Sequence, residues 1–122
     1  MAGRKVLVVD DEIHIIHVVT IKLRNSGFEV ITAQSAQEAY DLACRELPDV
    51  IITDYQMPNM TGLELLKTIR SDAMLKNTPV LLITAEAEKE NVVIAAQAGV
   101  NDYIVKPFTG DVLQQKINKI FG

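Results

Sequence analysis

Chemically capable side chains follow four short apolar segments of this 122-residue chain. The segments are residues 6–9, 50–53, 80–83 and 103–105, and the side chains that follow them are Asp10 with Asp11, Asp54, Thr84 and Lys106. The set contains three carboxylates, one hydroxyl and one ammonium group. Brought together, these groups could bind a divalent cation and a phosphoryl group.

The three carboxylates predict a metal site. Asp10, Asp11 and Asp54 would repel one another and raise each other's pKa values unless a cation lay among them. Hard oxygen ligands without histidine or cysteine favour Mg²⁺, with Mn²⁺ as a possible substitute. We therefore expect a magnesium ion as the cofactor.

The remaining groups suit phosphoryl transfer. Lys106 supplies a point positive charge and Thr84 a hydroxyl donor, which together with Mg²⁺ could surround the three terminal oxygens of a phosphoryl group. Phosphoryl transfer depends mostly on positioning and electrostatic stabilisation, so no general base is required. A carboxylate nucleophile forms an acyl phosphate, which water can hydrolyse. Such chemistry suits a signal that must be reset.

The elements that would position these groups alternate along the chain. The expected strands are residues 6–9, 28–33, 50–53, 80–83 and 103–105, and the expected helices are about 13–26, 36–46, 63–71, 88–98 and a last segment that includes residues 113–121. Ser35 is the predicted N-cap of the second helix. Five strands alternating with five helices predict an α/β domain with a parallel sheet covered on both faces.

The strand order follows from the position of the reactive residues. The second strand ends in Ala33 and Gln34, which offer no comparable chemistry. Ligands of open parallel sheets bind at the carboxyl ends of the strands, where the strand order reverses. We therefore predict a crevice between the first and third strands and the flavodoxin-like order 2-1-3-4-5.

Composition excludes several classes of protein. The length fits one domain, residues 1–122, and the net charge of −4 argues against direct nucleic-acid binding. No apolar run approaches the roughly 20 residues that span a bilayer, and no signal peptide is evident. Cys44 is the only cysteine, so an internal disulfide is excluded. We expect a cytoplasmic protein without membrane association.

The reactive residues lie in recognisable motifs. These are Val8-Val9-Asp10-Asp11-Glu12, Asp54-x-x-Met57-Pro58, Gly62, Thr84-Ala85 and Lys106-Pro107-Phe108. The constellation resembles the receiver domain of two-component response regulators over essentially the whole chain. The second half is most similar to the chemotaxis members of that family. In the first half, Glu12, Tyr55 and Gln56 stand where those members have phenylalanine, tryptophan and asparagine.

The resemblance implies roles for the acidic residues and their neighbours. Asp54 matches the phosphoacceptor, Asp11 the metal carboxylate and Asp10 a second acid that acts mainly through metal-bound water. Gln56 matches the position whose backbone carbonyl completes the metal site. Gln56 and Glu86 are also expected to tune water access to the pocket, and Gly62 is expected to serve backbone freedom.

The resemblance also implies a switch. Thr84 and Lys106 match the hydroxyl and ammonium that sense the phosphoryl group, and Tyr103 matches the aromatic side chain that follows Thr84 inward on activation. The Lys106–Pro107 peptide bond is expected to be cis.

Two kinds of partner are expected. A histidine kinase or phosphotransfer protein would supply the phosphoryl group. An output protein, or a second copy of the chain, would bind the face formed by the fourth helix, fifth strand and fifth helix. The expected face residues are Lys89, Val92, Ala96, Tyr103, Val105 and Lys116.

Alternatives in function remain open at this point. An aspartyl phosphatase would usually carry a second Asp two residues after the nucleophile and a cap over its active site. Gln56 occupies that position and the chain has no room for a cap, which favours a signalling module that promotes its own phosphorylation and dephosphorylation over an enzyme. The module could also be excised from a longer DNA-binding regulator, or be an engineered hybrid.

Overall fold

The sheet of this protein contains five parallel strands in the order β2-β1-β3-β4-β5, as the position of the reactive residues predicted. The computed structural model describes residues 4–57, 59–85 and 89–121. The strands are β1 (Lys5–Val9), β2 (Glu29–Ala33), β3 (Val50–Asp54), β4 (Val80–Thr84) and β5 (Asp102–Val105). The helices are α1 (Ile13–Asn25), α2 (Ala36–Glu46), α3 (Gly62–Ser71), α4 (Lys89–Gln97) and α5 (Gly110–Phe121).

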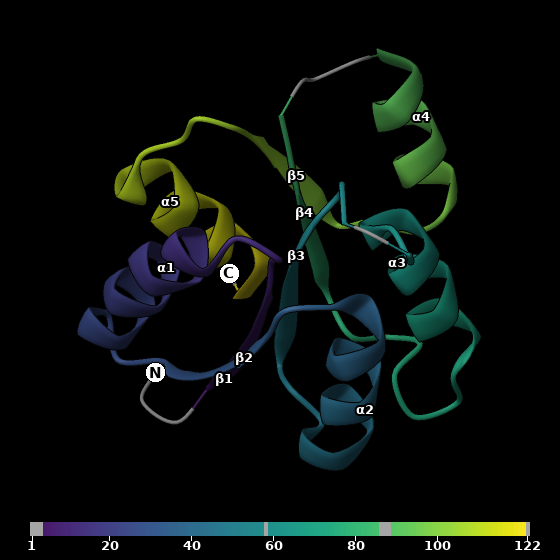
Figure 1. Cartoon of the computed structure of the whole chain (residues 1–122), viewed down its shortest axis with the longest axis horizontal. Coiled ribbons are helices and arrows are strands. Elements are labelled where there is room, and N and C mark those ends of the chain that lie inside the picture. The colour runs from purple at the N-terminus through teal and green to yellow at the C-terminus, as the bar shows by residue number, and fades with distance from the viewer. Residues whose placement is uncertain (1–3, 58, 86–88, 122) are drawn as a thin grey trace.

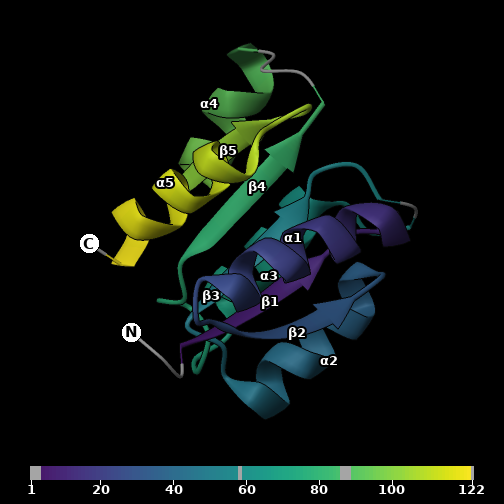
Figure 2. The ribbon, with the colours of Figure 1, turned by 90° about the vertical axis from the view of Figure 1, so that its left-hand side faces the viewer.

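The helices cover both faces of the sheet. Figure 1 shows α1 and α5 on one side and α2, α3 and α4 on the other, and Figure 2 views the sheet past α1 and α5. Successive strand residues point to opposite faces, so Val6 and Val8 pack with the α1 and α5 side while Leu7 and Val9 pack with the α2 and α3 side. Because both faces are buried, the central strands β1, β3 and β4 are mainly apolar on both faces rather than alternating.

Helix starts follow local capping chemistry. The Ser35 hydroxyl accepts a hydrogen bond from the backbone N–H of Glu38 at 3.2 Å, which confirms Ser35 as the N-cap of α2. Thr61 and Glu64 form a capping box at the start of α3. Gly99 follows α4 with a φ of 95°, the left-handed conformation that commonly ends a helix.

The boundaries of the five strands and of α1 to α4 differ from expectation by at most one residue. Asp54 and Thr84 are themselves the last residues of β3 and β4, because ladder hydrogen bonds rather than apolar character decide where a strand ends. Helix α5 begins at Gly110, three residues before its first core residue. Across the described ranges, no helix has both the length and the apolar character needed to cross a membrane.

Candidate functional site

The strand registers bring the predicted reactive residues to one edge of the sheet. Val9 of β1 is level with Thr53 of β3, so Asp10 and Asp54 follow at neighbouring positions. Thr84 of β4 is level with Val105 of β5, and the backbone N–H of Lys106 donates to the Thr84 carbonyl at 2.7 Å. Residues far apart in sequence therefore meet because parallel strands end together.

The Lys106 ammonium lies among three carboxylates. Its Nζ is 3.4 Å from Oδ2 of Asp10, 3.4 Å from Oδ2 of Asp54 and 3.6 Å from Oε1 of Glu12. Asp10 and Asp54 are only 1% and 4% exposed, and burying a carboxylate requires a partner of opposite charge. The Lys106–Pro107 peptide bond is cis, as expected.

The acidic residues form one group that fits a divalent cation. One carboxylate oxygen from each of Asp10, Asp11, Glu12 and Asp54 lies within 4.8 Å of the others. This donor set consists of hard oxygen atoms, with Asp11 and Glu12 on the exposed side and Asp10 and Asp54 buried. Oxygen ligands in such a set suit Mg²⁺.

Glu12 was not among the predicted site residues. The available signal was the uninterrupted acidic run from Asp10 to Glu12 at the end of a strand. Glu12 immediately precedes α1. The direction of its side chain therefore depends on how that helix packs, which the sequence alone does not indicate.

Burial and repulsion from neighbouring carboxylates raise the pKa values of Asp54 and Asp10. Burial, followed by the charge of Asp10, raises the pKa of Asp54 to about 6, although Lys106 and the backbone N–H of Gln56 oppose the shift. Burial also raises the pKa of Asp10. For Lys106, burial lowers the pKa, but the Asp54 and Asp10 charges outweigh it and the pKa is raised overall. A cation in the acidic group would relieve the same repulsion.

The other predicted pocket residues lie around Asp54. The backbone N–H of Gln56 is 3.4 Å from Asp54 Oδ1, and the Gln56 side chain is exposed. Thr84 is buried at the end of β4, and Tyr103 is half-buried on the adjacent strand. Glu86 lies outside the described residues.

The predicted partner face has a shallow groove between β5 and α5. The groove, of about 350 Å³, is lined by residues that include Tyr103, Val105, Val112 and Lys116. The Lys116 ammonium lies 3.0 Å from Asp102 Oδ1 and 5.6 Å from the centre of the Tyr103 ring.

The α4 part of the predicted partner face is only partly described. Ala96 is exposed on α4. Lys89 and Val92 belong to the same helix, but their side chains lie outside the described part of the chain.

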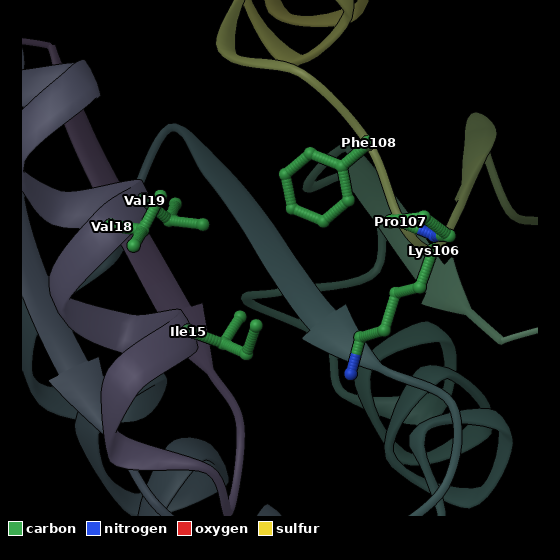
Figure 3. Close-up of a pocket in the computed structure, with 6 residues that line it drawn as sticks. All are labelled: Ile15, Val18, Val19, Lys106, Pro107 and Phe108. Carbon is green, nitrogen blue, oxygen red and sulfur yellow. The ribbon is translucent and has the colours of Figure 1, made fainter.

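A second hollow borders the reactive lysine. This α1 pocket, of about 370 Å³, is lined by Ile15, Val18, Val19, Lys106, Pro107 and Phe108. Figure 3 shows its apolar walls on α1 and on the segment after β5, with the Lys106 side chain extending along one border. Val18 is exposed, so apolar surface in the pocket that Lys106 borders is accessible to solvent.

Comparison with known proteins identifies the relatives of this chain. The family model "Response regulator receiver domain" matches residues 6–118. The chain is 44% identical over 118 residues to chemotaxis protein CheY of Pseudomonas aeruginosa, with 96% of this chain and 95% of that protein covered. It is 48% identical over 124 residues to CheY-3 of Vibrio cholerae, with 96% and 91% covered. The solved structure of CheY4 of Vibrio cholerae superposes with a TM-score of 0.93, at 37% identity, covering 98% of this chain and 99% of the other.

Proposed function

Because this chain belongs to the response regulator receiver domain family, we propose that it accepts a phosphoryl group on Asp54 in a Mg²⁺-dependent reaction. The observation that carries the proposal is the buried Asp54 carboxylate, 3.4 Å from the Lys106 ammonium and grouped with Asp10, Asp11 and Glu12. The donor would be a histidine kinase, a phosphotransfer protein or a small phosphodonor.

In the proposed reaction, an Asp54 oxygen attacks the phosphorus atom of the donor. A bond forms between that oxygen and phosphorus, and the bond between phosphorus and the leaving group of the donor breaks. Lys106, already 3.4 Å from Asp54 Oδ2, would stabilise negative charge on the transferred group. Water later hydrolyses the acyl phosphate and restores the carboxylate.

We assign the metal to the acidic group. Asp10, Asp11 and Asp54, with the backbone carbonyl of Gln56, would hold Mg²⁺. The ion would offset negative charge on both reactants. The donor set of the described residues supports this assignment.

A signalling role fits the site better than a hydrolytic one. Gln56 stands where an aspartyl phosphatase would carry its acid–base residue, and its side chain is exposed. Residues 1–122 would act as one receiver domain, because all the described strands join one sheet and the family match spans most of the chain. The chain would promote its own phosphorylation and dephosphorylation, and Gln56 with Glu86 would tune the lifetime of the acyl phosphate.

We propose that phosphorylation of Asp54 changes partner binding through movements of the Thr84 and Tyr103 side chains. A phosphoryl group on Asp54 would draw the Thr84 hydroxyl towards it, and Tyr103 would fill the space that Thr84 leaves. Thr84 and Tyr103 lie on adjacent strands beside the β5–α5 groove. The shift would favour binding of an output protein, or of a second copy, at the face of α4, β5 and α5.

Mass spectrometry tests the proposed acceptor. Incubation with acetyl phosphate and Mg²⁺ should add one acid-labile phosphoryl group to the wild-type chain and none to Asp54→Asn. Asp41→Asn is the matched control, because Asp41 is exposed on α2, away from the acidic group. Equal modification of Asp54→Asn and wild type would contradict the proposal.

A further inference from the structure

The backbone of Glu12 is fixed against the candidate site. Its N–H donates to Asp10 Oδ1 at 2.9 Å, and its carbonyl accepts from the N–H groups of Ile15 and Ile16 at the start of α1. Its side chain makes no capping hydrogen bond to the helix. The backbone position of Glu12 is therefore well defined, while its carboxylate is not used in capping the helix.

That carboxylate lies between a reactive residue and solvent. Glu12 Oε1 is 3.6 Å from the Lys106 ammonium, and Oε2 is 3.3 Å from His14 Nε2. The Glu12 side chain is 48% exposed, whereas Asp10 and Asp54 are buried. A phosphodonor that approaches Asp54 from solvent would pass close to this negative charge.

We propose that Glu12 is a positioning residue that selects among phosphodonors by their charge. Its carboxylate holds the Lys106 ammonium and competes with the phosphoryl group for it. It also repels donors in proportion to their negative charge. The inference rests on the proposed function and adds a specificity-determining residue to it.

The geometry of Lys106 supports the competition. An ammonium group has three N–H donors, and three carboxylates lie within 3.6 Å of Nζ. A phosphoryl group on Asp54 would need at least one of these donors. Glu12 is the partner most easily released, because it is the most exposed of the three.

The repulsion has a quantitative signature. Coulomb energy scales with the product of the charges, so removing the Glu12 charge should affect a dianionic donor about twice as strongly, in free energy, as a monoanionic one. If Glu12→Gln accelerates phosphorylation by a monoanion about threefold, it should accelerate phosphorylation by a dianion about tenfold. A change in helix capping or stability would affect both donors equally.

The experiment compares acetyl phosphate, a dianion near neutral pH, with phosphoramidate, a monoanion, at saturating Mg²⁺. Glu12→Gln should increase the rate with acetyl phosphate more than the rate with phosphoramidate, and the difference should shrink at high salt. Glu12→Gln should also bind the beryllofluoride anion several-fold more tightly, as measured by NMR titration. Asp41→Asn removes one negative charge away from the acidic group and should leave the phosphorylation rate with either donor unchanged.

Other outcomes would overturn the inference. Equal rate changes with both donors would show that Glu12 does not select donors by charge. A loss of Mg²⁺ affinity in calorimetry, together with slower phosphorylation by both donors, would make Glu12 a cation ligand instead. Phosphorylation of wild type with no effect of Glu12→Gln would remove this inference alone, whereas no phosphorylation of wild type would remove the proposed function as well.

Discussion

Gly62 lies so close to Asp54 that a β-carbon on Gly62 would overlap the Asp54 carbonyl oxygen. The contact occurs where the first turn of α3 meets the end of β3. The backbone N–H of Gly62 also donates to the Tyr55 carbonyl at 2.9 Å. The absence of a side chain at position 62 therefore helps to fix the backbone that presents the proposed phosphoacceptor.

We predict that Gly62→Ala destabilises the protein by about 1–3 kcal/mol, because the added methyl group must displace the backbone of Asp54. Alanine is otherwise the better helix former, so a loss of stability would report the overlap directly. Phosphorylation by acetyl phosphate should slow as well. Urea unfolding and initial rates are the measurements.

Gly110→Ala is the matched control for this prediction. Gly110 also begins a helix, but the three atoms nearest to a β-carbon there belong to the flexible Lys22 side chain, which can move away, and not to the backbone. The control should retain wild-type stability within about 0.5 kcal/mol. Equal effects of the two substitutions would show that the contact with Asp54 is unimportant.

Asp54 was predicted from the sequence as a site residue, whereas the close contact of Gly62 with it was not. Apolar runs that end in Asp54 or Thr84 predicted the strands, the strand order and the reactive edge, because these depend on local patterns and on general rules for parallel sheets. The role of Gly62 was expected to be backbone freedom, but its φ lies outside the left-handed region and close approach is the physical reason. Close approach between distant residues has no local pattern.

The same limit applies to the side chains of the site. The direction of the Glu12 carboxylate towards Lys106 depends on the packing of α1 against the sheet, which periodicity does not specify. The perturbed pKa of Asp54 depends on the depth of burial. Sequence thus predicted that Asp10, Asp54 and Lys106 meet, but not that Glu12 joins them, nor the distances and electrostatics of the site.

A second prediction concerns pH and Asp54. Its pKa is about 6 in the folded protein and about 4 in an unfolded chain, so the folded state binds the proton more tightly. Stability of the metal-free wild type should therefore fall as pH rises from about 4 to about 6, and stay lower above that. Asp54→Asn removes the unfavourable ionisation of this buried carboxyl, so its free energy of unfolding near neutral pH should exceed that of wild type by up to about 3 kcal/mol.

Metal-free unfolding curves across this pH range test the prediction. The pH-dependent part of the difference between Asp54→Asn and wild type should disappear at about pH 3 and below, where the Asp54 carboxyl is neutral in both the folded and the unfolded state. Asp49→Asn is a useful comparison, because Asp49 is exposed and lies at the opposite end of β3. A constant difference across the range would show that the stability change does not arise from ionisation of Asp54.

A third prediction concerns magnesium. Binding of Mg²⁺ to the folded state alone should raise the free energy of unfolding by about 1.4 kcal/mol when the free ion is at ten times its dissociation constant. Affinity should fall as pH drops through about 6, because the ion competes with the proton on Asp54. Calorimetric titration and thermal unfolding are the measurements.

Asp11→Asn should weaken the Mg²⁺ effect, since Asp11 supplies one oxygen of the acidic group. Asp41→Asn should preserve it. A melting temperature that does not respond to millimolar Mg²⁺, in wild type at neutral pH, would argue against a cation at this site.

The last prediction concerns the β5–α5 groove. Thr84 is level with Val105 across the β4–β5 ladder, and Tyr103, Val105 and Lys116 line the groove. Beryllofluoride with Mg²⁺ should therefore change the NMR chemical shifts of these three residues as well as those around Asp54. In Thr84→Ala, beryllofluoride should still change the Asp54 region but no longer the groove, because the proposed switch needs the Thr84 hydroxyl. Thr32→Ala, on the edge strand β2, should behave as wild type.

Phosphorylation should strengthen the binding of a partner or of a second copy at the groove by about 5- to 150-fold, the usual range of allosteric coupling. Val112→Glu places a charge on an exposed wall of the groove and should abolish that binding without preventing phosphorylation. Shifts confined to the Asp54 pocket in wild type, or spreading instead over α1, would place the output on a different surface.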